Sequence, residues 1–348
     1  MKNYKTPHFR KTALFVSLLF SGIIFSQNIS VDPYNSINKN NKGIKKMIVK
    51  LNDTIKEEHF FDKTGMPYLL KENSFSVKYY KYDKKNRIIK RIQGDIIRGF
   101  SCQEVKYFKN KTEVFSYLTE DEKNLQIEND QYLKNKANRI EYTIVGNDTI
   151  SIDDAYAVVT SDEEYYKYAK EIISIQDTTS MFNSFAFKNL MKEPKYMSFK
   201  ADYDSKLRPL NEKYFDSRNK ITSDRKFSYS GNTINITYKV DMIGTGEIVQ
   251  TLDSSGDILT EVEKQKVIKY KYDKGICIEK KEFQNNVLLN VTSHLYKDDL
   301  LQQDLYDDIQ NGGKFITDYV YDSNKRIVQI TNSSNYSKHV YQYTYEYY

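Results

Sequence analysis

The feature that most constrains this chain is a short phrase that encodes a complete β-hairpin and recurs along the sequence. Its fullest copy covers residues 78–90. Tyr80 and Tyr82 stand two residues apart, so on a strand they point to the same face. Asp83 follows at once, and its short side chain accepts backbone N–H groups further on, which starts a turn. Asn86 tolerates the left-handed conformation that closes such a turn.

Aspartates in the same position mark further copies of this hairpin. These turn acids are Asp62, Asp83, Asp216, Asp253, Asp273 and Asp322, and Asp204 and Asp298 follow the same pattern. Several of them recur at intervals of about 20–25 residues, which is the length of one hairpin plus its connection. We therefore predict a mainly β fold, in which antiparallel hairpins form a meander arranged as an extended or curled sheet.

The composition agrees with a β fold and excludes several classes of protein. The chain has 31 Tyr, 18 Phe and no Trp, and Tyr and Phe favour strands. Only 5 Pro and 13 Gly argue against collagen-like and low-complexity chains. Of 53 Lys and Arg residues four lie in residues 1–27, which leaves 49 against 47 Asp and Glu. A near-neutral chain without a concentrated basic stripe argues against a nucleic-acid partner.

Residues 1–27 have the pattern of a secretory signal peptide. A basic start precedes an apolar run over residues 13–25, and Ser26 supplies a small residue before a cut at or next to Gln27. An uncleaved membrane anchor is the alternative, although the apolar run is short for a bilayer span. Residues 28–45 read as a flexible lead-in. We predict export to the periplasm or the extracellular space, with no membrane span in the mature chain.

Residues 161–192 interrupt the hairpin pattern. Ser161 and Glu164 fit a capping box, and two apolar runs follow at helical spacing. We predict a two-helix insertion here, between an N-terminal β-hairpin region at 46–160 and a C-terminal β-hairpin repeat region at 193–348. The apolar faces of the helices are expected to pack on the sheet, and a groove for a partner is the alternative.

The hairpin phrase also resembles a known repeat. The stretches at 80–88 and 319–327 resemble the YD repeats of RHS-type bacterial surface and secreted proteins. The resemblance covers most of residues 55–348 outside the helical insertion, with Asn often in place of the family's Gly and without an intact Gly-Arg pair. It implies a meander of antiparallel hairpins in a secreted protein. The family's self-cleaving, toxin-enclosing role is not carried over, because the chain is too short for such a shell and its only Asp-Pro pair is Asp32-Pro33.

The residue usage and the end of the signal segment resemble proteins of the Bacteroidetes group. That group attaches O-linked glycans to exported proteins at Asp-Thr followed by an apolar residue or Thr. The resemblance implies glycosylation at Thr54, Thr149 and Thr178, for which ordinary turn chemistry is the alternative.

The sequence shows no recognisable catalytic or metal-binding constellation. His59, His294 and His339 do not pair at metal-ligand spacing, and no nucleophile elbow or phosphate-binding glycine loop occurs. Cys102 and Cys277 are interpreted as inert strand cysteines, with one long-range disulfide as the alternative. We predict no cofactor and no metal. Calcium bound by clustered turn acids is a minor alternative.

The last candidate is aromatic. Tyr341, Tyr343, Tyr345 and Tyr347 stand at strict period two, which predicts a terminal strand with an aromatic ladder as the binding surface. We predict an exported, non-catalytic β-repeat protein that binds a protein or glycan partner at the cell envelope. Two alternatives stay open. One is an envelope polysaccharide hydrolase that uses paired carboxylates, and the other is an accessory or immunity protein in bacterial competition.

Overall fold

The computed structural model describes residues 41–72, 75–119, 122–123, 142–145, 148–151, 168–241 and 243–348. The predicted signal peptide, residues 28–40 of the predicted lead-in and the predicted capping box at Ser161 lie outside these residues. The described residues belong to one compact unit, Asn41–Tyr348.

Strands dominate the described residues, and 20 of them form one antiparallel sheet. Seven precede the helices: β1 (Ile44–Leu51), β2 (Thr54–Phe61), β3 (Pro67–Glu72), β4 (Ser76–Tyr82), β5 (Ile88–Asp95), β6 (Gly99–Tyr107) and β7 (Lys111–Tyr117). Six follow them directly: β10 (Lys195–Tyr203), β11 (Pro209–Phe215), β12 (Ile221–Ser230), β13 (Thr233–Val240), β14 (Gly244–Leu252) and β15 (Ile258–Glu263). The remaining seven are β16 (Lys266–Asp273), β17 (Ile276–Gln284), β18 (Val287–Lys297), β19 (Leu300–Asp308), β20 (Gly313–Tyr321), β21 (Ile327–Ser334) and β22 (Lys338–Tyr347). A separate hairpin consists of β8 (Tyr142–Val145) and β9 (Asp148–Ser151).

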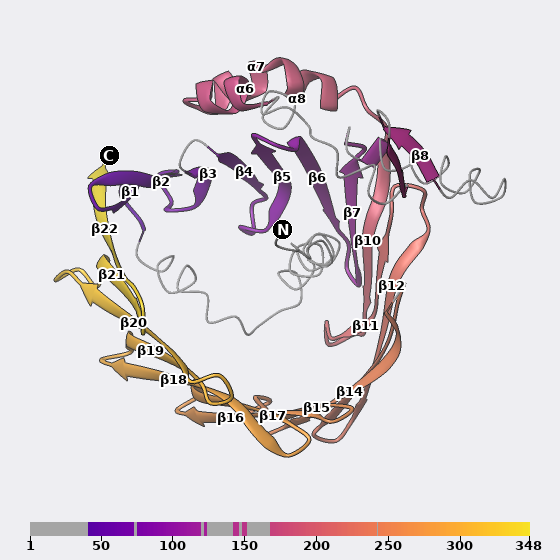
Figure 1. The fold of residues 1–348 in the computed structure, drawn as a ribbon, viewed down its shortest axis with the longest axis vertical. Coiled ribbons are helices and arrows are strands. Elements are labelled where there is room, and N and C mark those ends of the chain that lie inside the picture. Colours follow the sequence, from indigo (N-terminus) through magenta and orange to yellow (C-terminus); the bar gives the residue numbers. More distant parts are fainter. Residues whose placement is uncertain are drawn as a thin grey trace. The chain divides into compact units, whose positions relative to one another are not determined.

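The large sheet closes on itself. Each strand pairs with its neighbours in chain order, and β7 pairs with β10 across the insertion. The first and last strands also pair, with Met47 opposite Tyr345 and Val49 opposite Tyr343. Figure 1 shows the resulting ring, viewed along the barrel.

The prediction of an extended or curled sheet is therefore wrong. The meander of antiparallel hairpins is present, but it forms a closed barrel of 20 strands. Closure pairs the backbone groups of β1 and β22, which an open sheet would leave as two unpaired edges. The hairpin repeat encodes only pairing between neighbours in sequence, so it did not show that strands nearly 300 residues apart would meet.

The aspartate turns follow one design. At Asp83 the backbone N–H bonds to Arg87 O, and the carboxylate accepts the N–H groups of Lys85 and Arg87. Asn86 lies in the left-handed region with φ of 58°. The turns that begin at Asp62, Asp204, Asp216, Asp253 and Asp322 repeat these bonds. This is the three-residue hairpin loop with a bulge after it, so the shift in register after each turn follows from the loop.

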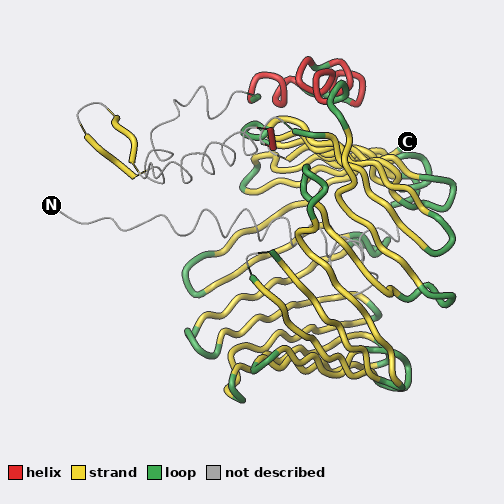
Figure 2. The backbone as a smooth tube through the Cα atoms, turned by 90° about the vertical axis from the view of Figure 1, so that its right-hand side faces the viewer, coloured by secondary structure: helices red, strands yellow, loops and turns green. Residues whose placement is uncertain are grey.

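Three short helices lie in the described part of the insertion: α6 (Ala169–Ser174), α7 (Thr178–Asn183) and α8 (Phe185–Leu190). The prediction of two helices is corrected to three. A capping box at Asp177 and Ser180 starts α7, and Ser184 then ends α7 and caps α8. The helices bury Ile172, Met181 and Leu190, with other apolar residues, against the outward side of β3–β7. Figure 1 shows the helices outside the ring, over β4–β6, and Figure 2 shows the helices in red on one side of the strands.

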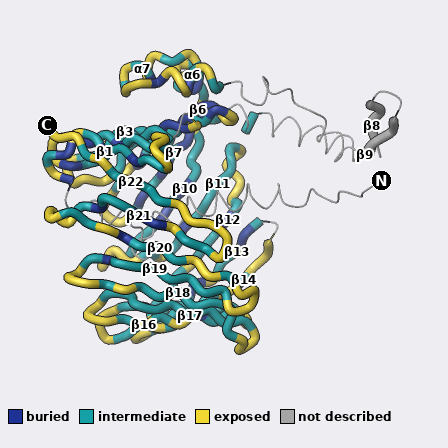
Figure 3. The backbone as a smooth tube through the Cα atoms, turned by 60° about the vertical axis from the view of Figure 1, so that its left-hand side comes forward, coloured by how far each residue is buried: buried dark blue, intermediate teal, exposed yellow. Residues whose placement is uncertain are grey.

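This packing assigns the two faces of the sheet. Leu69, Val77, Ile92 and Cys102 contact the helices, so they lie on the outer face. Side chains alternate along a strand, and residues that are paired across strands share a face. The pairing register then assigns the side chains of every strand around the ring to the inner or the outer face. Figure 3 shows that the buried positions concentrate in β1–β7 and β10, beside the helices, while the hairpin turns are exposed.

The outer face carries charged side chains across β7 and β10–β13, and an apolar row of Val249, Val262, Val267 and Phe283 across β14–β17. One row across β7, β10, β11, β12 and β13 consists of Glu113, Lys200, Lys213, Asp224 and Lys239. The neighbouring row on the inner face consists of Val114, Phe199, Tyr214, Ser223 and Val240. No helix of the described residues is long and apolar enough to cross a membrane.

Candidate functional site

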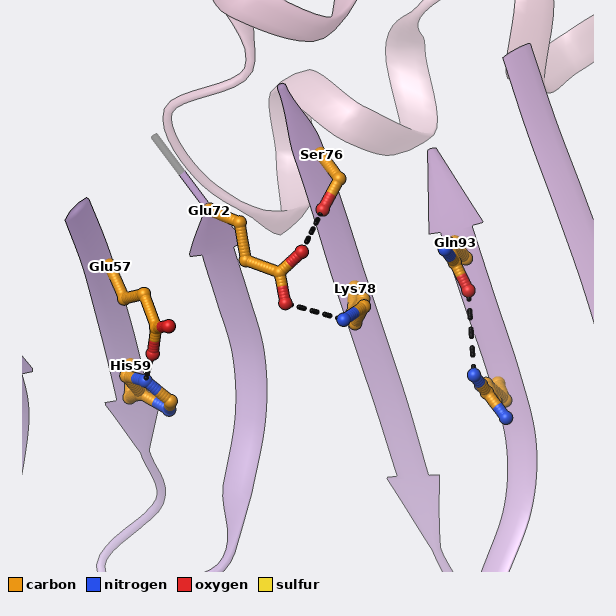
Figure 4. Close-up of polar contacts among 7 residues, drawn as sticks. Glu57, His59, Glu72, Ser76, Lys78 and Gln93 are labelled. Atoms are coloured by element: carbon orange, nitrogen blue, oxygen red, sulfur yellow. Dashed lines mark hydrogen bonds and ion pairs between the residues drawn. The ribbon is translucent and has the colours of Figure 1, made fainter. Parts of the chain in front are cut away.

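The inner face of β2–β5 carries a polar cluster, which Figure 4 shows from inside the barrel. His59 on β2 lies between Met47 and Leu70, and Leu70 is followed across the sheet by Lys78 and Gln93. None of these residues can point toward the helices, because Leu69, Val77 and Ile92 next to them do. We name this group the inner polar cluster: Glu57, His59, Glu72, Ser76, Lys78, Arg91 and Gln93.

Acidic residues in this cluster are paired with donors. His59 Nε2 lies 2.8 Å from Glu57 Oε2, and the imidazole is almost fully buried. Glu72 accepts a hydrogen bond of 2.5 Å from the Ser76 hydroxyl with one oxygen and pairs with the Lys78 ammonium through the other. The Lys78 ammonium offsets the charge of Glu72, and the His59 ring is a hydrogen-bond partner of Glu57.

The two carboxylates are direct neighbours. Glu57 on β2 lies opposite Glu72 on β3 in the pairing register. Like charges at opposed positions destabilise a sheet unless other groups compensate them, and the Lys78 ammonium compensates the charge of Glu72. A glycosidase needs its two carboxyl groups on either side of the scissile bond. Glu57 and Glu72 instead stand side by side on one wall, so their geometry suits binding better than hydrolysis.

A second polar row crosses the inner face of β11–β15. Glu212 on β11 is opposite Arg225 on β12, which is opposite Tyr238 on β13. Tyr238 donates its hydroxyl to the Glu263 carboxylate on β15. Its ring reaches β15 over Gly246 on β14, where an added Cβ would lie 2.2 Å from the tyrosine oxygen. Gly246 is therefore the residue that lets this contact form.

Glu212 has an unusual environment within the second row. Only 4% of its surface is exposed, and the Arg225 guanidinium lies 4.0 Å away. Burial raises the pKa of the Glu212 carboxyl, and the positive charge of Arg225 offsets only part of that effect.

A third group lies on β18–β20. Asp304 bridges two side chains, since one carboxylate oxygen lies 2.5 Å from His294 Nδ1 and the other accepts a 2.8 Å hydrogen bond from Tyr319. A carboxylate on one imidazole nitrogen fixes the orientation of the ring. Burial and the adjacent Asp304 charge raise the pKa of Tyr319. No group of three or more His, Cys, Asp or Glu side chains within the described residues could hold a metal ion.

Tyrosines on the inner face join one hairpin to the next. Tyr82 precedes the Asp83 turn, and its hydroxyl donates to Pro67 O of the previous hairpin at 2.7 Å. The same contact runs from Tyr107 to Ile88 O, Tyr229 to Pro209 O, Tyr321 to Leu301 O and Tyr345 to Ile327 O, at 2.5–3.0 Å. Two of these tyrosines, Tyr82 and Tyr321, belong to Tyr-Asp pairs. In those pairs the Tyr ties neighbouring hairpins together and the Asp forms the turn.

The terminal tyrosine ladder lies on the same inner face. Tyr341, Tyr343 and Tyr345 are half-buried and pack on the cluster of Ile44, Met47, Val49 and Phe61. Tyr347 is exposed, and its hydroxyl accepts a 2.7 Å hydrogen bond from Arg326. The structure thus places the predicted ladder on the wall of the barrel. A role in binding stays a prediction.

The other predicted residues lie apart from these polar groups. Asp273 ends β16 ahead of a turn at Lys274 and Gly275, both with positive φ. Thr54 begins β2, Thr149 lies in β9, and Thr178 begins α7. Cys102 and Cys277 are free thiols. Cys102 is buried beneath the helices, and Cys277 is paired with Tyr272 on another part of the ring, so a disulfide between them is absent.

The three polar groups were not predicted from the sequence, although part of the signal was present. Period-two alternation in β2 shows that His59 and Phe60 point to opposite faces of the sheet. The alternation in β4 shows the same for Lys78 and Val77. It does not show which face is inside, because that depends on where the helices pack. The Glu57–Glu72 pairing also depends on the bulge that follows Phe60.

Comparisons with known proteins do not assign a family. No family model matches the sequence, and no curated protein matches it. Among solved structures, a TcdB2-TccC3-Cdc42 complex has a TM-score of 0.28 at 10% identity, over 88% of this chain and 17% of that one. A porin-like protein from Bacteroides uniformis has a TM-score of 0.25 at 9% identity, over 88% of this chain and 99% of that one. These scores are too low to assign a shared fold or function, and the YD-repeat resemblance stays a prediction.

Proposed function

We propose that this chain is an exported, non-catalytic β-barrel protein that binds a partner at the cell envelope through its inner face. Closed barrels of about 16–18 strands already enclose a space that their own side chains do not fill. A ring of 20 strands is wider still. Most inner-face residues outside β1–β7 are only half-buried, which supports access to that wall.

The observation that carries the proposal is the chemistry of the inner face. The inner polar cluster brings together carboxylates, an amide and basic groups, and the row from Glu212 to Glu263 adds the ring of Tyr238 beside the Glu263 carboxylate. Aromatic rings stack on the apolar faces of sugar rings, and carboxylate and amide oxygens accept hydrogen bonds from hydroxyl groups. Between the two partner classes, this combination favours a glycan over a protein. The envelope location rests on the predicted signal peptide.

The test compares two adjacent residues that point in opposite directions. Glu57 lies on the inner face, and Glu58 lies on the outer face, where it pairs with Lys46 and Lys71. Glycans of the bacterial envelope are screened on an array, and the affinity of each binder is measured for the wild type, Glu57→Gln and Glu58→Gln. We expect Glu57→Gln to weaken binding about tenfold and Glu58→Gln to leave it unchanged, since one charge-assisted hydrogen bond is worth about 1.5 kcal/mol or more.

Two results would remove the proposal. If the array shows no binder, a glycan is not the partner, and if both substitutions weaken binding equally, the inner face is not the binding surface. Binding of a polypeptide from an envelope extract, lost in Glu57→Gln alone, would keep the site and exchange the glycan for a protein. Release of shorter glycan products by the wild type would favour the hydrolase alternative.

A further inference from the structure

A polar row crosses the inner face of β19–β22. It begins at Asp304 on β19 and continues through Thr317 on β20, Asn332 on β21 and His339 on β22, each opposite the next in the pairing register. His339 points to the same side as Tyr341, two residues further along β22, which lies on the wall of the barrel. Figure 1 shows β19–β21 on the lower left of the ring, away from the helices.

The end of this row that is distant from Asp304 has unused hydrogen-bonding groups. Asn332 and His339 are both exposed, and neither side chain makes a hydrogen bond or an ion pair with another described residue. An amide and an imidazole can each donate and accept hydrogen bonds. Directly opposed residues have Cβ atoms about 5 Å apart, so the two side chains can reach neighbouring hydroxyl groups of one small ligand.

An exposed aromatic ring lies beside these groups. Phe315 on β20 belongs to the next row of the inner face, between Tyr306 on β19 and Ser334 on β21. Phe315 is 53% exposed, and its ring centroid lies 6.0 Å from that of Tyr306. A Cβ added to Gly313 would lie 3.6 Å from Cε2 of Phe315, so the ring leans toward the β19–β20 turn. Asn332 is a diagonal neighbour of Phe315, at about 7–8 Å.

The combination distinguishes this part of the wall from the other polar groups. Glu72 is paired with Lys78, and Glu263 accepts the hydroxyl of Tyr238, so those groups satisfy one another. Asn332 is satisfied only by solvent or by a ligand. Exposed polar residues and single exposed apolar residues are each ordinary on a protein surface. An exposed aromatic ring next to unpaired hydrogen-bonding groups, on a concave wall, is the arrangement that binds a ligand with one apolar face and a polar edge.

The charges of the same wall favour a neutral ligand. No Lys or Arg lies on the inner face within β19–β22, all of whose residues are described. The acids on that face are Asp304, which is bonded to His294 and Tyr319, and Asp308, which accepts two hydrogen bonds from Asn311. An anionic ligand would meet two carboxylates and no cation. A neutral ligand meets no such repulsion, and it has no need of the carboxylate oxygens that are already bonded.

We infer that Phe315, Asn332 and His339 form a subsite for a neutral sugar residue, which we name the sugar subsite. The apolar face of the sugar ring stacks on Phe315, and its hydroxyl groups exchange hydrogen bonds with the amide and the imidazole. This inference rests on the proposed glycan binding, because it specifies where on the inner face a sugar binds and of which class. The subsite is separate from the inner polar cluster on β2–β5.

The experiment measures binding by calorimetry for cellohexaose, maltohexaose and mannohexaose, and for every binder found on the envelope glycan array. The hexamer of mannuronic acid is the charged counterpart of mannohexaose, with carboxylates in place of hydroxymethyl groups. Phe315→Leu removes the ring and keeps an apolar side chain, Phe315→Tyr keeps the ring, and Asn332→Ala removes the amide.

Two matched controls lie outside the subsite. Phe108→Leu changes a phenylalanine that is 50% exposed in the β6–β7 turn. Gln342→Ala changes an exposed amide on β22 that points to the outer face, next to Tyr341. All the substituted residues are exposed, so the variants should fold, and circular dichroism and thermal unfolding verify this.

We expect a neutral glycan to bind, with affinity reduced about tenfold in Phe315→Leu and about fivefold in Asn332→Ala. Phe315→Tyr and the two controls should bind as the wild type does, and the mannuronic acid hexamer should bind more weakly than mannohexaose. If Glu57→Gln weakens a binder and Phe315→Leu weakens none, the sugar subsite is wrong while the proposed function stands. The subsite is also wrong if Phe108→Leu weakens binding as much as Phe315→Leu, or if only anionic glycans bind. If neither the array nor the three hexaoses give a binder, the proposed function and the subsite fail together.

Discussion

The hydroxyl of Tyr348 donates a hydrogen bond of 2.5 Å to the backbone carbonyl of Phe61, 287 residues earlier in the chain. The backbone N–H of Tyr348 bonds to Gly43 O beside it. These contacts close the ring where β22 meets β1 and β2. They extend to the closing seam the same tyrosine-to-carbonyl contact that joins one hairpin to the next elsewhere in the barrel.

Removing one such hydroxyl should lower the free energy of unfolding of the barrel. Tyr82→Phe deletes the donor to Pro67 O and leaves the ring in place. We expect a loss of about 1 kcal/mol in the free energy of unfolding, the usual net value of one hydrogen bond. Tyr80→Phe is the control, because Tyr80 lies two residues away on the same face and its hydroxyl has no hydrogen-bond partner among the described residues. Denaturant unfolding measures both, and equal losses would show that the contact to Pro67 does not matter.

A turn position offers a stabilising substitution. Leu207 closes the Asp204 turn with φ of 61°, in the left-handed region that costs a branched L-residue about 1 kcal/mol. Gly65 and Gly256 occupy the same place in the turns of Asp62 and Asp253, with φ of 89° and 92°. Leu207→Gly should therefore raise the free energy of unfolding by about 1 kcal/mol, since the exposed leucine side chain contributes little packing.

The reverse exchange is the control for that prediction. Gly256→Leu places a branched residue in the same conformation and should lower stability by a similar amount. A thermal melting temperature that falls in Leu207→Gly would contradict the assignment of strain to this turn.

Local structure was readable from the sequence where a residue's role is decided by its neighbours in the chain. The Asp83 turn, its left-handed Asn86 and the flanking strands form as the residues predict, because a three-residue loop and its bulge are local chemistry. The terminal strand with Tyr341 and Tyr343 was readable in the same way. Its partner was not, because the pairing of Val49 with Tyr343 depends on the accumulated geometry of all the strands between them.

The candidate site could not be predicted from neighbours in the chain. His59, Lys78 and Glu72 approach one another only because β2, β3 and β4 pair in a particular register, with a bulge after Phe60. One residue of slip would move each side chain to the other face. The helices pack on the outer face of these strands, and that too depends on the pairing register. Composition and period alone therefore show neither the inner position of the cluster nor the exposure of the Phe315 ring.

The tyrosines should make the barrel sensitive to alkali. Burial raises the pKa of Tyr229, Tyr272 and Tyr321 to about 12, from the ordinary value of 10.0. Below pH 10 these hydroxyls are protonated in both the folded and the unfolded chain, so their contribution to stability is fully present. Between pH 10 and about 12 the unfolded chain loses the protons that the folded chain keeps, and stability falls as the pH rises.

Thermal unfolding across that pH range checks the prediction, with an ultraviolet titration of the tyrosinates in parallel. The control is a variant in which all three tyrosines are replaced by phenylalanine. Its melting temperature should start lower and should fall less steeply above pH 10. An identical slope in the variant would assign the alkaline loss to other groups.

Gly246 provides the sharpest test of the inner face, because its role depends on a single partner. A Cβ at this position would lie 2.2 Å from the Tyr238 hydroxyl, so Gly246→Ala must displace the ring and break its hydrogen bond to Glu263. The ring can swing aside, so we expect a loss of about 1 kcal/mol, close to the value of the hydrogen bond. In a Tyr238→Ala background nothing remains to clash, and Gly246→Ala should be neutral or slightly stabilising, since alanine loses less chain entropy than glycine on folding. A double-mutant cycle measured by denaturant unfolding gives the coupling directly, and we expect about 1 kcal/mol. A coupling near zero would mean that Tyr238 does not cross β14 to reach β15, and the polar row from Glu212 to Glu263 would then end at Tyr238.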